Sequence, residues 1–248
     1  MLPLIAVPAA LTDGERERYQ RTMAIEGFGE EAQGRLKAAT ACCIGAGGLG
    51  GPVLQYLVGA GVGRVVIVDD DIVEERNLQR QTLYGTATLG CAKAESAAAR
   101  LRDLNPLVEL IAVTRRVTED SVDAILGGCD VVVDAVDNLP TRLLVARACQ
   151  RLGLPLVFGA VQAVNGQVTV LWERHGLALS DLFPSPPQDC PTAAEVGVLG
   201  PMTGWVGSVM ATEVVKLITG TGEPLLGRVM YIDTLGARVA ELPLAGRS

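Results

Sequence analysis

The sequence predicts an α/β protein with a mostly parallel central sheet, helices on both faces and an antiparallel extension near the C-terminus. Short apolar runs alternate with longer helical segments from residue 39 to residue 172, which is typical of βαβ units. The apolar runs are continuous, as in strands that are covered on both sides. A glycine-rich string directly follows the first run, and two short strand-like strings lie near the end of the chain.

Composition excludes several classes of protein. Hydrophobic residues make up 49% of the 248 residues and charged residues 20%, which excludes a disordered chain. A net charge of −7 without a basic cluster argues against nucleic acid as a partner. The apolar run at residues 2–11 has no basic residue before it and is too short to span a bilayer, so no signal peptide or membrane partner is expected. The six scattered cysteines, without a C-x-x-C pair, indicate small buried residues in the cytoplasm.

The first elements form one βαβ unit. Residues 15–38 are charged and helical in period, so one or two helices are expected there. The apolar run at 39–44 predicts a strand, and the segment behind the glycines at 45–50 predicts a helix that ends near 61–63. The apolar run at 64–69 predicts the second strand and completes the unit.

The alternation continues through the rest of the core. Helices are expected at 91–104, 119–126 and 141–152, and strands at 108–113, 130–135, 156–158 and 167–172. Pro140 before the third of these helices and Gly153 after it match the usual start and stop residues. The pair Asn165-Gly166 predicts a turn between the last two strands.

Residues 173–200 differ from the core because four prolines interrupt them, so we expect a long structureless loop of functional importance. A helix at 202–219 and strands at 228–233 and 238–242 should follow. We expect one domain over residues 1–248, made of an N-terminal helical segment (1–38), a nucleotide-binding core (39–172), a crossover loop (173–200) and a C-terminal helix with strands (201–248).

The string Gly45-x-Gly47-x-x-Gly50 predicts a phosphate-binding turn of a Rossmann-like fold. Glycine lets the backbone approach the phosphates, and the following helix supplies free N–H groups. Asp69, at the end of the second strand, has the position of an acid that bonds ribose hydroxyls. These residues alone favour an NAD enzyme, and a glycine turn that only packs helix on strand is the alternative without function.

A second set of polar residues favours ATP instead. Asn77 and Arg80 follow the second strand one helical turn apart, Lys93 lies on the next helix, and Asp137 and Asn138 end a later strand. A triphosphate needs several cations and a carboxylate for Mg²⁺, because catalysis at phosphorus is chiefly positioning and charge stabilisation. Arg80, Lys93 and Asp137 supply that set, and solvated surface charges are the alternative.

Five strings now identify a family. They are Arg18-Tyr19-Gln20-Arg21, the glycine loop, Asn77-Leu78-Gln79-Arg80-Gln81 with Lys93, Asp137-Asn138, and Gly197-Val198-Leu199-Gly200-Pro201. In these strings the chain resembles the ubiquitin-activating-enzyme-like adenylyltransferases of molybdopterin and thiamine biosynthesis, the MoeB/ThiF family. The resemblance runs in register from about residue 16 to residue 242.

The resemblance implies a homodimer with one ATP site in each subunit. The nucleotide would be held by Gly45, Gly47, Gly48 and Gly50 at the phosphates, Asp69 at the ribose, Asn77, Arg80 and Lys93 at the triphosphate, and Asp71, Gln81 and Asn138 nearby. Asp137 would coordinate Mg²⁺, and Arg21 would reach into the partner subunit's site. Arg80, Lys93, Asp137 and Arg21 are therefore the candidate catalytic residues.

The implied substrate is a small ubiquitin-like sulfur-carrier protein that ends in Gly-Gly. Its terminal carboxylate would attack the α-phosphate of ATP and release pyrophosphate. A carboxylate is ionised at neutral pH, so no general base is required. The one histidine, His175, is therefore expected at the surface. No rhodanese-like domain follows, so a separate sulfur donor is expected to form the thiocarboxylate.

The sequence departs from the family at two places. Most relatives carry two C-x-x-C pairs that hold zinc, but Ala178 and Asp181 occupy the first pair here and no later pair exists, so no zinc is expected. Several relatives place a reactive cysteine where this chain has Ala193. Cys190 is a candidate to replace it as a thioester or persulfide carrier, although the neighbouring Asp189 opposes the lowered pKa that such a thiol needs.

Three alternatives to a carrier adenylyltransferase remain open at this stage. They are an NAD-dependent oxidoreductase, a nucleotide-binding scaffold without turnover, and the same adenylation chemistry on a peptide or a tRNA nucleoside. The sequence does not identify the carrier, the sulfur source or the downstream pathway.

Overall fold

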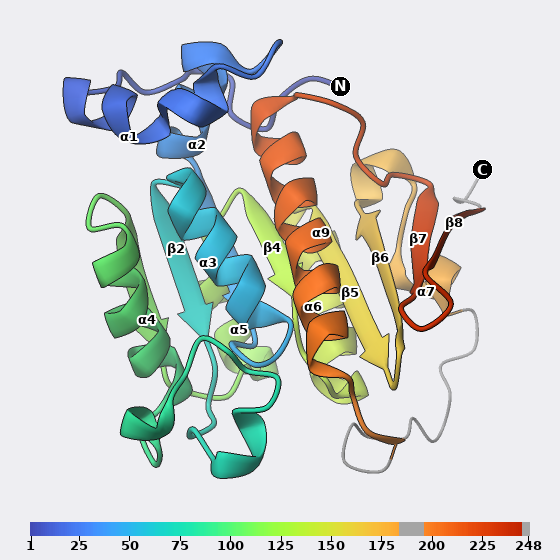
Figure 1. Ribbon diagram of the computed structural model, residues 1–248. Coiled ribbons are helices and arrows are strands. Elements are labelled where there is room, and N and C mark those ends of the chain that lie inside the picture. Colours follow the sequence, from blue (N-terminus) through green and yellow to red (C-terminus); the bar gives the residue numbers. More distant parts are fainter. Residues whose placement is uncertain (184–195, 245–248) are drawn as a thin grey trace.

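The structure is a computed structural model that describes residues 1–183 and 196–244 (Figure 1). Its strands are β1 (Thr40–Ile44), β2 (Arg64–Val68), β3 (Glu109–Val113), β4 (Val131–Asp134), β5 (Leu156–Gln162), β6 (Asn165–Leu171), β7 (Arg228–Asp233) and β8 (Arg238–Pro243). Its α-helices are α1 (Asp13–Met23), α2 (Gly29–Ala38), α3 (Gly50–Ala60), α4 (Lys93–Leu104), α5 (Glu119–Leu126), α6 (Leu139–Leu152), α7 (Leu179–Leu182) and α9 (Gly200–Thr219). Short 3₁₀ turns are η1 (Glu75–Asn77), η2 (Thr86–Thr88) and η3 (Glu173–His175).

The eight strands form one sheet in the order β3-β2-β1-β4-β5-β6-β7-β8. The strands from β3 to β5 pair in parallel, and the pairs β5–β6, β6–β7 and β7–β8 are antiparallel. The predicted fold class, a mostly parallel sheet with an antiparallel C-terminal extension, is therefore confirmed.

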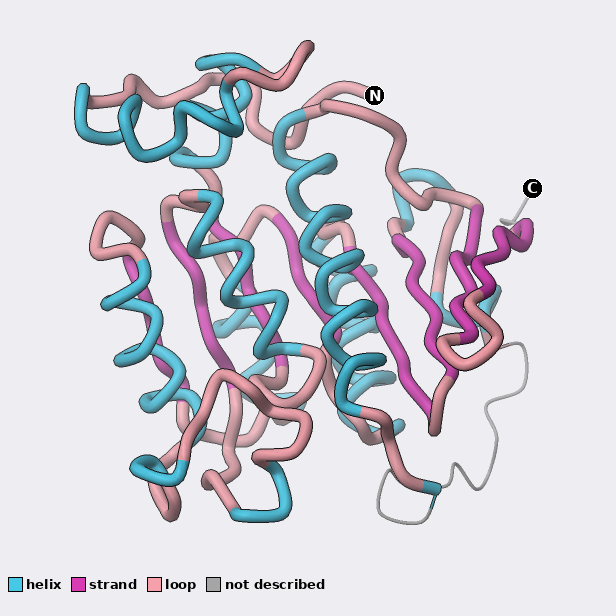
Figure 2. Tube along the Cα trace, viewed as in Figure 1, coloured by secondary structure: helices cyan, strands magenta, loops and turns pink. Residues whose placement is uncertain are grey.

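Helices cover both faces of the parallel strands (Figures 1 and 2). In β1, Ala41 and Cys43 belong to the core layer that also contains buried residues of α3, α4 and α9. The alternate residues Cys42 and Ile44 belong to the opposite layer, with α5 and α6. Burial on both faces explains why the strands are apolar throughout instead of alternating. Among the described residues no helix is long and apolar enough to cross a membrane.

The strand order changes direction at β1, which pairs with β2 on one side and β4 on the other. Helices α1 and α2 lie beyond the amino ends of these strands, at the top of Figure 1. The loops after β1, β2 and β4 gather at the opposite, carboxyl edge. Open α/β sheets bind ligands at such a point of reversal.

The hairpin between β5 and β6 turns earlier than predicted. Asn165 and Gly166 are already paired with the end of β5, so the predicted turn at these residues is wrong. The turn residues are Ala163 and Val164, and Ala163 has a φ of +53°. A Cβ on Gly166 would overlap Val206 of α9, so packing against this helix explains the glycine.

The prediction of a structureless segment at 173–200 is wrong for its first part, which contains η3 and α7. Buried Leu177 and Leu179 pack in the same core layer as α6 and hold this part against the sheet. His175 is exposed, as predicted.

The cysteines that the structure describes behave as small core residues, except Cys91. Cys42, Cys43, Cys129 and Cys149 are buried, whereas Cys91 is exposed and Cys190 lies outside the described residues. Desolvation by burial raises the pKa of the Cys43 and Cys149 thiols, which keeps them protonated and unreactive.

Two adjacent glycines at the start of α3 allow a matched test of the backbone packing. A Cβ on Gly50 would overlap the carbonyl oxygen of Gly45, whereas a Cβ on Gly51 would meet only the Leu83 Cβ, at 3.5 Å. We expect Gly50→Ala to lower the free energy of unfolding by about 1–3 kcal/mol. Gly51→Ala should leave it unchanged or raise it by up to about 1 kcal/mol, because alanine favours helix. Urea denaturation measures both, and equal losses in the two variants would contradict this account.

Candidate active site

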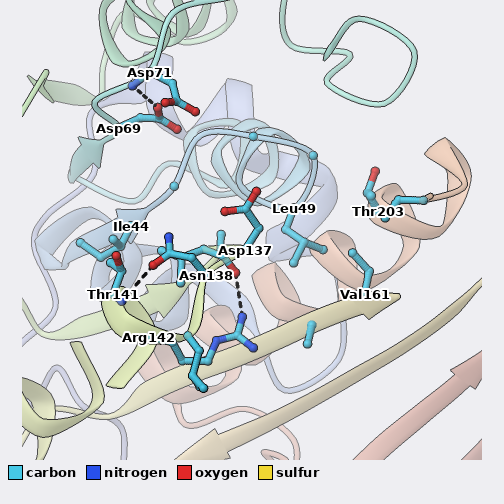
Figure 3. Close-up of a pocket in the computed structure, with 18 of the residues that line it drawn as sticks. Ile44, Leu49, Asp69, Asp71, Asp137, Asn138, Thr141, Arg142, Val161 and Thr203 are labelled. Carbon is cyan, nitrogen blue, oxygen red and sulfur yellow. Dashed lines mark hydrogen bonds between the residues drawn. The ribbon is translucent and has the colours of Figure 1, made fainter. Parts of the chain in front are cut away.

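A cavity of about 740 Å³ opens at the carboxyl edge of the parallel strands (Figure 3). It is lined by the glycine loop, the ends of β2 to β5, and the beginning of α9. The predicted site residues that line it are Gly45, Gly47, Gly48, Asp69, Asp71, Arg80, Gln81, Lys93, Asp137 and Asn138. Segments almost a hundred residues apart thus contribute to one pocket.

The glycine loop approaches the end of β4 closely. Gly45 has a φ of +94°, and a Cβ on it would lie 2.7 Å from the carbonyl oxygen of Ala135. Gly48 faces Thr203 of α9, whose Cγ2 would lie 3.1 Å from an added Cβ. Helix α3 begins behind this loop without a side-chain cap on its N–H groups. Such a helix start attracts anions, and phosphate in particular.

Asp69 holds the glycine loop to the end of β2. Its Oδ2 accepts the Ala46 N–H at 2.8 Å, and its Oδ1 accepts the Asp71 N–H at 2.9 Å (Figure 3). Desolvation by burial raises the pKa of the Asp69 carboxyl, although these hydrogen bonds and the charge of Lys93 oppose the shift. The acid predicted to bind a ribose therefore also fixes the loop predicted to bind phosphates.

Both the ammonium group and the backbone carbonyl of Lys93 are held by neighbouring side chains. Its Nζ lies 2.9 Å from Asp71 Oδ2, and the residue is only 5% exposed. The hydroxyl of Tyr84 lies 2.7 Å from the Ala46 carbonyl and 3.3 Å from the Lys93 carbonyl. This buried tyrosine joins the start of α4 to the glycine loop, so the ammonium group stays at the pocket wall.

Arg80 and Asp137 are among the charged groups of the pocket that remain available to a ligand. The Arg80 guanidinium donates to the Arg76 carbonyl at 3.2 Å and pairs with no carboxylate in the described part of the chain. The exposed Asp137 carboxylate has no ion pair within the described ranges, and Figure 3 shows it projecting on the glycine-loop side of its turn. The Oε1 of buried Gln81 also has no hydrogen-bond partner among the residues that the structure describes. A cation, an anion and an unpaired acceptor fit a polyphosphate with a divalent metal.

Three predicted residues do not line the pocket. Gly50 packs against the backbone of Gly45, and buried Asn77 accepts the Glu74 N–H at 3.1 Å. Both shape the surrounding loops. Exposed Arg21 lies on α1, at the other end of the sheet from the pocket of its own chain (Figure 1).

Several pocket residues were not predicted from the sequence. Arg142 lies four residues after Asn138, on the first turns of α6, and forms an ion pair with buried Asp134 at 2.9 Å. Arg115 and Arg116 follow β3 and line the far wall. Arg142 could have been predicted from the sequence, because it is a cation one helical turn after the Asp137-Asn138 string. Arg115 and Arg116 could have been predicted as an adjacent pair of arginines at the end of a strand.

The departures from the family fall partly outside the described residues. Ala178 and Asp181, at the first zinc-ligand pair of relatives, instead form the start of α7, where the Ala178 N–H donates to Asp181 Oδ2 at 2.7 Å. Within residues 1–183 and 196–244, no three His, Cys, Asp or Glu side chains cluster as metal ligands. Asp189, Cys190 and Ala193 lie in the segment that the structure does not describe.

Comparisons with known proteins identify the family and similar folds. Residues 19–248 match the ThiF family. The sulfur carrier protein adenylyltransferase of Thermus thermophilus is 48% identical over 238 residues, covering 93% of this chain and 88% of that protein. The SAMP-activating enzyme E1 of Haloferax volcanii is 44% identical over 229 residues, covering 92% and 84%. The crystal structure of Escherichia coli MccB with ATP is similar in fold, with a TM-score of 0.78 and 20% identity over 93% of this chain and 72% of that one.

The unpaired cation at Arg80 leads to a binding prediction. We expect the purified protein to bind Mg-ATP and not NAD, and Arg80→Met to weaken ATP binding about 10- to 100-fold, because a charge-assisted hydrogen bond to phosphate is lost. Arg76→Met is the matched control, since Arg76 pairs with Glu74 outside the pocket. Calorimetry with both nucleotides measures this. NAD binding without an ATP signal, or equal losses in the two variants, would overturn the assignment.

Proposed function

The chain belongs to the ThiF family, and we propose that it uses ATP to adenylate the C-terminal glycine carboxylate of a small ubiquitin-like sulfur-carrier protein. The observation that carries this proposal is the pocket at the strand ends, where Arg80, Lys93 and Asp137 meet the glycine loop. Relatives named as carrier-activating enzymes, which this chain matches over 84–88% of their length, support the same substrate class. An NAD-dependent oxidoreductase is not favoured, because the Thermus thermophilus relative is an adenylyltransferase by name.

The nucleotide would lie along the carboxyl edge of the sheet. The glycine loop and the start of α3 would hold its phosphates, Asp69 its ribose, and Arg80 and Lys93 its triphosphate charge. Asp137 would hold Mg²⁺, which supplies charge neutralisation between phosphate oxygens when bound. A single carboxylate suits this metal, because Mg²⁺ retains waters and takes substrate phosphates as further ligands.

The reaction is a substitution at the α-phosphorus. A carboxylate oxygen of the carrier's last glycine forms the new P–O bond, the bond to the bridging oxygen breaks, and pyrophosphate leaves with the electron pair. The nucleophile is already ionised at neutral pH, so the site needs cations more than a base. Exposed His175, outside the pocket and beside Trp172, agrees with this requirement.

The carrier tail would enter from the uncharged end of the cavity. There the lining includes amide side chains and small residues of β5 and β6, together with one tyrosine of β7. These residues are Val161, Gln162, Asn165, Gly166, Gln167 and Tyr231. A glycine tail offers only backbone groups for recognition, and amides can both donate to and accept from them.

A separate donor would then supply the sulfur that converts the adenylated carrier into a thiocarboxylate. In this proposal Cys190 takes part only in a later acyl or sulfur transfer and not in adenylation. The protein would act in the cytoplasm.

A homodimer would explain the position of Arg21. The pocket lies at the carboxyl ends of the strands and α1 lies beyond their amino ends, so Arg21 cannot serve the site of its own chain (Figure 1). A second copy placed antiparallel across α3 and α9 would bring its α1 toward this pocket. Tyr56 of α3 and Trp205 of α9 are 60% and 40% exposed, which offers an apolar contact for that copy.

Substitutions in the pocket test the chemistry. Asp137→Ala and Arg80→Ala should each lower carrier-dependent ATP–pyrophosphate exchange on the order of 10²–10³-fold, because each removes a group that balances charge in the transition state. Arg174→Ala, a solvent-exposed change beside Trp172, should leave the rate unchanged. Near wild-type exchange in a folded Asp137→Ala or Arg80→Ala protein would remove that residue from its proposed role.

Mixed dimers test the role of Arg21. Arg21→Ala and Asp137→Ala proteins should each be inactive alone but regain part of the exchange activity when mixed, because a mixed dimer contains one site free of both lesions. Subunit exchange is first verified with differently tagged chains. If mixing then restores nothing, Arg21 does not complete a partner's site.

A further inference from the structure

A buried ion pair lies directly beneath the proposed metal carboxylate. Arg142 Nε and Asp134 Oδ2 are 2.9 Å apart, and their side chains are 11% and 0% exposed. Desolvation by burial raises the pKa of the Asp134 carboxyl, and the charge of Arg142 opposes that shift. Removing two charges from water is costly, and such pairs can often be replaced by apolar residues without loss of stability. Stability alone therefore does not account for this pair.

The pair fixes both peptide groups of Val136, the residue before Asp137. Asp134 Oδ1 accepts the Val136 N–H at 3.2 Å, and Arg142 Nη2 donates to the Val136 carbonyl at 2.7 Å. The two bonds hold the peptide planes on either side of the Val136 Cα. They therefore set the direction in which the chain, and with it the Asp137 side chain, leaves β4.

Rigid neighbours fix the guanidinium itself. Arg142 Nη2 also donates to the Gly159 carbonyl of β5 at 3.0 Å, and its Cζ lies 4.5 Å from the centre of the fully buried Phe158 ring. From the helix side, Asn138 Oδ1 accepts the Thr141 N–H at 3.0 Å and caps α6. Figure 3 shows Arg142 and the Asp137 carboxylate on opposite sides of the same turn. Only a planar group with several donors can pair with a carboxylate, donate to two carbonyls and stack on a ring at the same time.

We infer that Arg142, paired with Asp134, is a positioning residue that aims the Asp137 carboxylate at the metal–phosphate site. This inference rests on the proposed function, because it assigns Asp137 to Mg²⁺. Arg142 acts through the Val136 backbone and not by contact with the reacting atoms. A purely structural pair would stabilise the fold and leave the metal dependence of the folded protein unchanged.

The decisive variant is Arg142→Lys, which keeps the charge but loses the multiple directed donors. Calorimetry with ATP alone and with ATP plus Mg²⁺ gives a readout that needs no turnover. We expect the metal-free Kd to match wild type, and the tightening caused by Mg²⁺ to fall about 10- to 100-fold, as when an outer residue that orients a metal ligand is removed. Exchange assays with a ubiquitin-fold carrier ending in Gly-Gly should show a lower kcat and an unchanged KM for the carrier. The Mg²⁺ concentration that gives half the maximal rate should rise about 10- to 100-fold, as in the calorimetry.

Glu213→Gln is the matched control. Glu213 is 1% exposed and pairs with Lys216 at 2.6 Å on α9, away from the pocket. It should lower the melting temperature without changing the Mg²⁺ dependence. Should Arg142→Lys fail to fold, the isosteric Asp134→Asn variant is measured in the same way and decides the question.

A double-mutant cycle separates action through Asp137 from other effects. In an Asp137→Asn background, Arg142→Lys should have little further effect on the Mg²⁺ dependence, because the carboxylate that it positions is already lost. A full additional effect in that background, or a folded Arg142→Lys protein with the Mg²⁺ dependence of wild type, overturns the inference. Absence of exchange in the wild-type protein would instead refute the proposed function, and the calorimetric cycle would still test the positioning role.

Discussion

Burial of the parallel sheet on both faces is the constraint from which the site follows. A strand between two helical layers has no wet face, so β1, β2 and β4 carry apolar side chains along almost their whole length. Polar chemistry can enter only where a strand ends. Asp69 follows β2, Asp134 closes β4, and the glycine loop follows β1. Parallel pairing brings these ends to one edge, and the change of strand order at β1 separates the loops there, as at other ligand sites of such sheets.

Close backbone approach at this edge leaves little freedom to the loops. Gly45 lies against the carbonyl of Ala135, so the phosphate loop and the end of β4 form one packed unit. Asp69 joins that unit to β2 through the Ala46 N–H, and Tyr84 joins it to α4. A ligand would thus meet a pocket whose walls are already oriented, which reduces the ordering that binding requires.

Features that depend on local interactions were predicted from the sequence, whereas features that depend on contacts between distant segments were not. Helices and strands of the core were predicted within a few residues, because hydrophobic period and capping residues act locally. The β5–β6 turn was misplaced because Gly166 is required by Val206 of α9, forty residues later in the chain. Asp69 and Asp137 were predicted as pocket residues from their positions at strand ends, together with the glycine motif and the family resemblance. Arg142 was missed because its partners come from β4, the following turn and β5, and no local pattern specifies such a set.

The pairing of charges around the pocket explains why its composition favours a nucleoside triphosphate over a dinucleotide. Most acids at the strand ends already have a cation: Asp71 pairs with Lys93, Asp70 with Arg116, and Asp134 with Arg142. Within the described residues, Asp69 accepts two backbone N–H groups, Asp137 has no ion pair, and Arg80 and Arg115 have no carboxylate partner. Unpaired charge at a pocket wall is favourable only if solvent or a ligand compensates it. Phosphate oxygens would compensate the cations and a divalent metal would compensate the carboxylate, whereas NAD has only a diphosphate for the cations and brings no metal for the carboxylate. Under the proposed function the direction of Asp137 would be critical, because this exposed carboxylate would hold the metal while Asp70, Asp71 and Asp134 are engaged in ion pairs.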